Sequence, residues 1–125
     1  MANDTLLFIY GTLKRGDVRS YLLDGQRYLG QAKTVPCYRL FDVGAYPALV
    51  EATPLGMTGL SIQGELWQVD GDCLSRLDEE EGVDEGLYER RSIQLLGDHG
   101  DAVSYFYRLP VVGLADCGER WEIRC

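Results

Sequence analysis

The chain is a succession of short apolar or alternating runs, each interrupted after a few residues by glycine, aspartate or proline. Runs of this length and spacing are typical of β-strands. The strands that we expect from them are Thr5–Tyr10, Tyr28–Val35, Tyr38–Val43, Ala48–Ala52, Ser61–Val69, Tyr88–Leu96 and Val103–Leu109, with a weaker candidate at Arg120–Arg124. So many short strands favour a curved, mostly antiparallel sheet.

Only two segments show the pattern of a helix. In Asp17–Asp24 apolar residues recur at helical spacing, and Gly25 follows as a stop. The second segment begins near Asp70 or Asp72, both good N-caps, and ends at Gly82. A doubly wound α/β sheet would need a crossover helix between most strands. The sequence therefore predicts an α+β fold, a mostly antiparallel closed β-barrel with two short helices.

The length and net charge of the chain limit its domain organisation and the partners that it can bind. We expect a single domain over residues 1–125, because this length suits one domain of ordinary size. Twelve basic against twenty acidic residues give a net charge of −8, which repels phosphate backbones and anionic lipid. We therefore expect neither a nucleic acid nor a membrane as partner. The start of the chain lacks the basic end and long apolar run of a signal peptide, which predicts a cytoplasmic protein.

The four cysteines do not have the spacing of a zinc site or of a redox-active pair. They stand at positions Cys37, Cys73, Cys117 and Cys125, and no two are spaced as C-x-x-C. With His99 as the one histidine, no zinc site is expected, and reduced thiols are the favoured interpretation over a Cys117–Cys125 bridge. A thiol hydrolase that pairs a cysteine with His99 is a weaker alternative, because no cysteine has the surroundings of an activated nucleophile.

The corner after the first strand has the shape of an anion site. The strand ends at Tyr10, and Gly11 opens a polar turn that closes at Gly16. Successive backbone N–H groups in such a turn form a concavity that can hold a carboxylate or phosphate. The glycine spacing imitates half of a Walker A loop, but Asp17 and Val18 stand where Lys and Ser or Thr belong. On spacing alone, a plain strand-turn-helix corner remains the commoner interpretation.

The acidic run at the end of the second helix singles out one carboxylate. At about 100° per residue, Glu81 projects onto the same face as Leu74 and Leu77, whereas Glu79 and Glu80 project away from it. A carboxylate on the core face is desolvated, and with no obvious basic partner beside it Glu81 is a candidate general acid/base. The alternative is that the helix ends at Asp78 and that Glu81 already lies in a loop.

Taken together, these segments resemble a known family. The segments that carry the resemblance are Tyr10–Gly16, Leu77–Gly82 and Tyr88–Arg90, with weaker support from Tyr46–Val50, Ile62–Trp67 and the pair Gly118 and Trp121. In this order and in so short a chain, they resemble the gamma-glutamylcyclotransferase superfamily. The likeness is strongest to the short-chain branch that contains gamma-glutamylamine cyclotransferase, and it covers almost the whole chain.

The resemblance implies a barrel with a cavity and no cofactor or metal. Its substrate would be a small γ-glutamyl compound whose glutamyl head is held by the backbone of three residues, Gly11, Thr12 and Leu13. Glu81 would be the single catalytic acid/base. Tyr10 and Tyr88 are plausible pocket walls or hydroxyl donors, although buried tyrosines also serve as packing.

The implied reaction is an intramolecular aminolysis. The α-amine of the γ-glutamyl group attacks its own γ-carbonyl, which gives 5-oxoproline and releases an amine or amino acid. The acidic stretch Gly82–Leu87 is expected at the pocket rim, where it would favour a cationic leaving group. The competing hypothesis is a non-catalytic module on the same barrel that binds a small acidic metabolite.

Overall fold

The computed structural model describes residues 4–11, 14, 19–44 and 46–121. Its elements in chain order are β1 (Thr5–Ile9), the 3-10 helix η1 (Ser20–Leu23), β2 (Arg27–Lys33), β3 (Tyr38–Asp42), β4 (Pro47–Glu51), the 3-10 helix η2 (Thr53–Leu55), β5 (Gln63–Val69), α1 (Gly71–Glu80), β6 (Tyr88–Ile93), β7 (Ala102–Tyr107) and β8 (Ala115–Asp116). The seven stronger expected strands are confirmed as β1 to β7, with ends that shift by a few residues.

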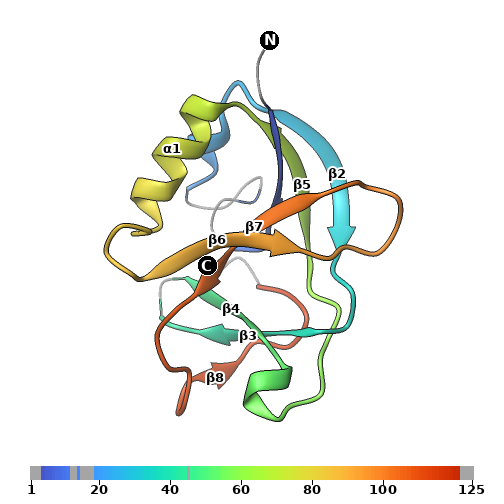
Figure 1. Cartoon of the computed structure of the whole chain (residues 1–125), viewed down its shortest axis with the longest axis vertical. Coiled ribbons are helices and arrows are strands. Elements are labelled where there is room, and N and C mark those ends of the chain that lie inside the picture. Colours follow the sequence, from blue (N-terminus) through green and yellow to red (C-terminus); the bar gives the residue numbers. More distant parts are fainter. Residues whose placement is uncertain (1–3, 12–13, 15–18, 45, 122–125) are drawn as a thin grey trace.

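The strands form two sheets (Figure 1). The larger has five strands in the order β2-β5-β1-β7-β6, and the smaller has three in the order β4-β3-β8. Neighbouring strands are antiparallel except β1 and β7, which are parallel. Strand β1 is therefore the centre of the larger sheet, and its apolar sequence suits a strand that is covered on both faces.

The prediction of a closed barrel is wrong, because both sheets are open. Within the described residues, the two edges of the larger sheet, β2 and β6, meet only at an isolated bridge between Thr34 and Leu95. Strand β6 buries Tyr88 and Ile93 at its ends but exposes the four residues between them, as an edge strand does. Alternation in a sequence shows which residues face a core, but it does not show which strand edges pair.

Two cores lie on opposite faces of the larger sheet. Side chains of β1 alternate between them, with Leu7 and Ile9 packed in the cluster that includes α1. Phe8 and Tyr10 point to the other face and pack in the cluster that includes residues of β3 and β4. The end of β1 thus lies where the helix, the larger sheet and the smaller sheet come together.

Helix α1 begins and ends where the sequence predicts. The Asp70 carboxylate accepts a hydrogen bond of 2.8 Å from the backbone N–H of Cys73, which makes Asp70 the N-cap. At the other end Gly82 has φ of 67°, and the Val83 N–H donates to the Asp78 carbonyl at 3.0 Å. These contacts form a Schellman motif, with Glu81 as the last residue in helical conformation.

Other expectations are met only in part. Where we expect a helix over Asp17–Asp24, the described residues form only the short 3-10 turn Ser20–Leu23. Asp17 and Val18 lie outside the described residues, and within the described part of the chain the two-helix prediction is corrected to one α-helix and two 3-10 turns. Of the weak strand candidate at the end, Arg120 and Trp121 are not in a strand, and residues 122–125 lie outside the described residues. No helix in the described part of the chain is long and apolar enough to cross a membrane.

Candidate active site

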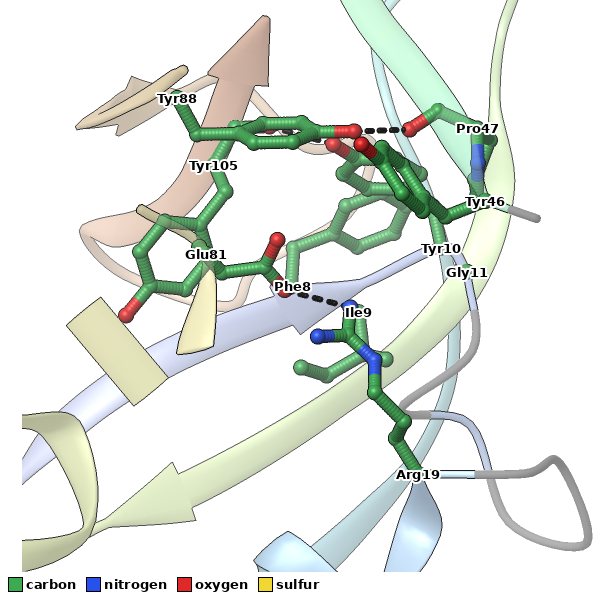
Figure 2. A pocket seen from close by; sticks show the side chains of 10 residues that line it. All are labelled: Phe8, Ile9, Tyr10, Gly11, Arg19, Tyr46, Pro47, Glu81, Tyr88 and Tyr105. Carbon is green, nitrogen blue, oxygen red and sulfur yellow. Dashed lines mark hydrogen bonds and ion pairs between the residues drawn. The ribbon is translucent and has the colours of Figure 1, made fainter. Parts of the chain in front are cut away.

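A pocket opens at the end of β1, between the last turn of α1 and the start of β4 (Figure 2). The empty space at its mouth and interior together is about 310 Å³, a figure that includes open solvent. Most of its wall is aromatic or apolar, and the residues that line it are Phe8, Ile9, Tyr10, Gly11, Arg19, Tyr46, Pro47, Glu81, Tyr88 and Tyr105. An apolar wall with a few convergent polar groups is typical of a small-molecule site.

The end of α1 places Glu81 in this pocket. Its backbone N–H donates to the Leu77 carbonyl at 2.9 Å, so its side chain keeps the helical direction toward the core. Glu81 is 7% exposed, whereas its neighbours Glu79 and Glu80 point into solvent. Burial raises the pKa of Glu81 because the charged carboxylate loses its hydration, and the charge of Glu80 adds to the rise. The sequence leaves open whether Glu81 lies in the helix or in a loop. The structure supports the helical alternative, because Glu81 keeps helical backbone angles at the end of α1.

A basic partner does face Glu81, contrary to the expectation from the sequence. The guanidinium Nη2 of Arg19 donates to Glu81 Oε1 at 3.0 Å (Figure 2). Arg19 precedes η1 and reaches the pocket from the side opposite the tyrosines. Its charge lowers the pKa of Glu81, but this effect is smaller than that of burial. The carboxylate is therefore desolvated and yet held by one cation.

Three tyrosines of the pocket use their hydroxyl protons within the protein. Tyr10 donates to the Tyr105 backbone carbonyl, and Tyr88 donates to the Pro47 carbonyl at 2.6 Å. Tyr105 donates to the Asp78 carboxylate at 2.7 Å. Burial raises the pKa of all three phenols, so they stay neutral. Tyr10 and Tyr88 thus line this pocket, and their hydroxyls join its walls together.

Gly11 lies against Pro47 at the pocket wall. A Cβ atom on Gly11 would come within 2.8 Å of Pro47 Cγ, which is closer than two carbons can pack. Glycine is therefore required by the close approach of β4. The other expected members of this corner, Thr12 and Leu13, lie outside the described residues, and their N–H groups stay a prediction.

Asp78 ties the helix to the sheet beside the pocket. Its two carboxylate oxygens accept from Nε and Nη2 of Arg90 at 3.0 and 3.1 Å, and one of them also accepts from the Tyr105 hydroxyl. These partners belong to β6 and β7, so one side chain joins α1 to two strands. The two acids at the end of the helix are therefore used differently, Asp78 for attachment and Glu81 in the pocket.

The acidic rim that we expect at the pocket is not present. None of the residues Gly82–Leu87 lines the pocket, although Asp84 and Glu85 are exposed nearby in the chain. His99 lies at a different surface groove that no described cysteine lines. Among the described residues, no group of three His, Cys, Asp or Glu side chains could hold a metal ion.

Sequence reasoning missed some residues that the fold brings to the pocket. Tyr105 had a signal, because its period-two neighbours mark one face of a buried strand. Tyr46 and Pro47 counted only toward the resemblance. Arg19 had no signal of its own, since it is far from Glu81 in the chain and stands in a segment that reads as a surface helix.

Comparisons with known proteins agree on one family. The family model described as gamma-glutamyl cyclotransferase, AIG2-like, matches residues 7–122. A Vibrio cholerae protein that bears the provisional name gamma-glutamylcyclotransferase is 39% identical over 103 residues, which cover 82% of this chain and 82% of that protein. Gamma-glutamylaminecyclotransferase A of Danio rerio is 35% identical over 109 residues, covering 80% of this chain and 65% of that protein.

Solved structures show the same fold. An AIG2-like protein of Mus musculus superposes with a TM-score of 0.78 at 26% identity, over 95% of this chain and 88% of that protein. A protein specific to uropathogenic Escherichia coli superposes with a TM-score of 0.77 at 20% identity, over 94% of this chain and 90% of that protein. At that identity the second likeness concerns the fold alone.

Proposed function

Because this chain belongs to the gamma-glutamyl cyclotransferase, AIG2-like family, we propose that it converts a γ-glutamyl amine or amide into 5-oxoproline and a free amine. In this reaction the α-nitrogen forms a bond to the γ-carbonyl carbon, and the bond from that carbon to the leaving nitrogen breaks. Two protons leave the α-nitrogen as the ammonium becomes the lactam N–H, and two reach the leaving nitrogen, which departs as an ammonium ion. The observation that carries the proposal is the buried carboxylate of Glu81 in a pocket lined by Gly11 and aromatic side chains.

A single carboxylate closes the proton count. Glu81 takes a proton from the α-ammonium, which frees the nitrogen lone pair for attack, and gives a proton to the leaving nitrogen as its bond to carbon breaks. It then carries the second proton from the new lactam nitrogen to the freed amine in the same way. Since the nucleophile and the carbonyl belong to one molecule, the pocket need only hold the glutamyl chain in a bent shape. The raised pKa of Glu81 suits this role, because a base works best when its pKa lies closer to the working pH.

We propose an amine, rather than an amino acid, as the leaving group. The exposed acids Glu79, Glu80, Asp84 and Glu85 lie close in the chain to Glu81. Their field attracts a cation and repels a carboxylate that approaches the pocket. A leaving group that carries a second amine, such as a lysine side chain, meets this condition.

The test is a panel of γ-glutamyl compounds with 5-oxoproline as the readout. We expect turnover with γ-glutamyl amines, and we expect Glu81→Gln to lower it by about 10²–10⁴-fold because the amide cannot carry the proton. The matched controls Glu79→Gln and Glu80→Gln, which remove exposed carboxylates, keep turnover within a few-fold. Binding of γ-glutamyl compounds without any 5-oxoproline would instead support the non-catalytic binding module, and three equally active variants would exclude a single-carboxylate mechanism.

A further inference from the structure

Tyr46 brings a hydroxyl group to the pocket from the loop that leads into β4. The residue is half-buried and lines the pocket, and its ring contacts that of Tyr88 with the two centroids 6.0 Å apart. Its side chain points toward the space into which the Glu81 carboxylate also projects (Figure 2). Tyr46 and Glu81 therefore face one ligand from two walls, the start of β4 and the end of α1.

The Tyr46 hydroxyl differs from the other three tyrosine hydroxyls of the wall. Those of Tyr10, Tyr88 and Tyr105 donate their protons to acceptors within the protein. Among the described residues, the Tyr46 hydroxyl makes no hydrogen bond, and the interaction of its side chain is the ring contact with Tyr88. Its proton is therefore available to an acceptor on a ligand.

The backbone around Tyr46 is held in place. Its carbonyl accepts from the Val43 N–H at 3.1 Å. The next residue, Pro47, is buried, accepts from the Tyr88 hydroxyl at 2.6 Å and fills the space beside Gly11. A hydroxyl on such a segment is positioned before the ligand arrives, so little reorganisation is needed when charge develops near it.

The proposed ring closure creates a negative charge on an oxygen. When the α-nitrogen bonds to the γ-carbonyl carbon, the π electron pair of the carbonyl moves to its oxygen, and it returns when the bond to the leaving nitrogen breaks. In a mostly aromatic pocket this oxyanion needs a hydrogen-bond donor, and a tyrosine hydroxyl is suitable. Glu81 does not meet this need, because its proton is transferred to the leaving nitrogen.

Two other groups of the wall carry N–H donors. The Arg19 guanidinium donates to Glu81 at 3.0 Å and so balances the charge of the acid. The corner that begins at Gly11 is expected from the sequence to hold the glutamyl head with its backbone N–H groups. A group that holds the head does so before and during the reaction, whereas catalysis requires a contact that strengthens as charge develops. Tyr46 is in a position to supply that contact.

We propose that the Tyr46 hydroxyl donates a hydrogen bond to the γ-carbonyl oxygen and stabilises the oxyanion of the tetrahedral intermediate. This inference rests on the proposed function, to which it adds a second catalytic residue beside Glu81. Tyr46 keeps its proton throughout, since its hydrogen bond only strengthens while the electron pair is on the oxygen. Because that charge is absent from the free substrate, the contact acts on kcat more than on KM.

The variant Tyr46→Phe removes the hydroxyl and keeps the ring against Tyr88. We expect kcat for a γ-glutamyl amine to fall by about 10²–10³-fold with KM within a few-fold, as for the loss of one oxyanion donor. The matched control Tyr21→Phe removes the hydroxyl of a tyrosine that is 60% exposed, and it leaves both constants unchanged. Thermal unfolding checks the fold of Tyr46→Phe, whose Tm should equal that of the parent.

A second substrate separates a contact with the carbonyl oxygen from a structural role. The γ-thioamide of the same amine carries sulfur in place of this oxygen, closes to 5-thioxoproline and releases the same amine. Release of that amine measures both reactions. Sulfur is a weak acceptor, so we expect the parent to prefer the oxygen substrate and Tyr46→Phe to reduce this preference by about tenfold or more.

Two outcomes would overturn the inference while 5-oxoproline formation by the parent upholds the proposed function. One is an unchanged kcat in Tyr46→Phe, which would leave the oxyanion to the Gly11 corner or to Arg19. The other is an equal loss on the oxygen and sulfur substrates, which would indicate a change in the shape of the pocket. A parent that forms no 5-oxoproline refutes the proposed function itself, and the role of Tyr46 in ring closure falls with it.

Discussion

Asp78→Asn tests whether the two acids at the end of α1 have separate roles. The change keeps the size of the side chain but removes the charge that Arg90 and the Tyr105 hydroxyl contact. The ion pair is partly exposed, with side chains 24% and 36% accessible, so its loss costs up to about 1 kcal/mol. The Tyr105 contact weakens from a charged to a neutral hydrogen bond, which costs about 0.5–2 kcal/mol more.

The expected total is about 1–3 kcal/mol in the free energy of unfolding, or about 3–10 °C in Tm for a chain of this size. Urea and thermal unfolding followed by circular dichroism measure it, with Glu79→Gln as the exposed control on the same helix. Turnover of the folded Asp78→Asn protein should stay within about tenfold, because Asp78 contacts the pocket only through Tyr105 and does not itself line it. An Asp78→Asn protein as stable as the parent but as inactive as Glu81→Gln would refute this division of roles.

Three further predictions use the same measurements. Because burial raises the pKa of Glu81, ionisation is disfavoured in the folded state. The stability that Glu81 contributes is therefore full below its unfolded pKa and falls as pH rises through the folded one, so Glu81→Gln should gain in Tm relative to the parent as pH rises through that window. Gly11→Val should raise KM, since its Cβ would collide with Pro47; an unchanged KM would count against the tight corner. Alkylation of exposed Cys37 under native conditions should leave turnover unchanged while Cys73 stays unmodified, and inactivation would revive a thiol mechanism.

The parts of the fold that follow from local rules could be predicted. Helix α1 begins at a side chain that caps a backbone N–H and ends at a glycine with positive φ, and both signals are visible in Asp70 and Gly82. Once the bounds of the helix are known, its angular period separates Glu81 from Glu79 and Glu80. The buried carboxylate of the pocket was therefore within reach of sequence reasoning.

The parts of the fold that depend on long-range pairing of strands could not be predicted from the sequence. The prediction of a closed barrel was wrong. Alternation in β2 and β6 shows which of their residues face a core, but it does not show whether the edges of these two strands pair with each other. Strand β8 is only Ala115–Asp116, too short to leave a pattern, and it is held by register with β3. Arg19 reaches Glu81 across a gap in sequence that no local periodicity spans, so the charge balance of the site was missing as well.

That balance explains why the acid lies at the end of a helix and opposite an arginine. The carbonyl end of a helix carries partial negative charge, which disfavours a carboxylate there, and burial beside Glu80 adds to the effect. Without a counter-charge the pKa of Glu81 would be raised further. Arg19 offsets part of this rise, because its guanidinium stabilises the ionised form. In the mechanism that we propose, the cation that sequence reasoning missed would help this buried acid to return the proton that it takes from the substrate.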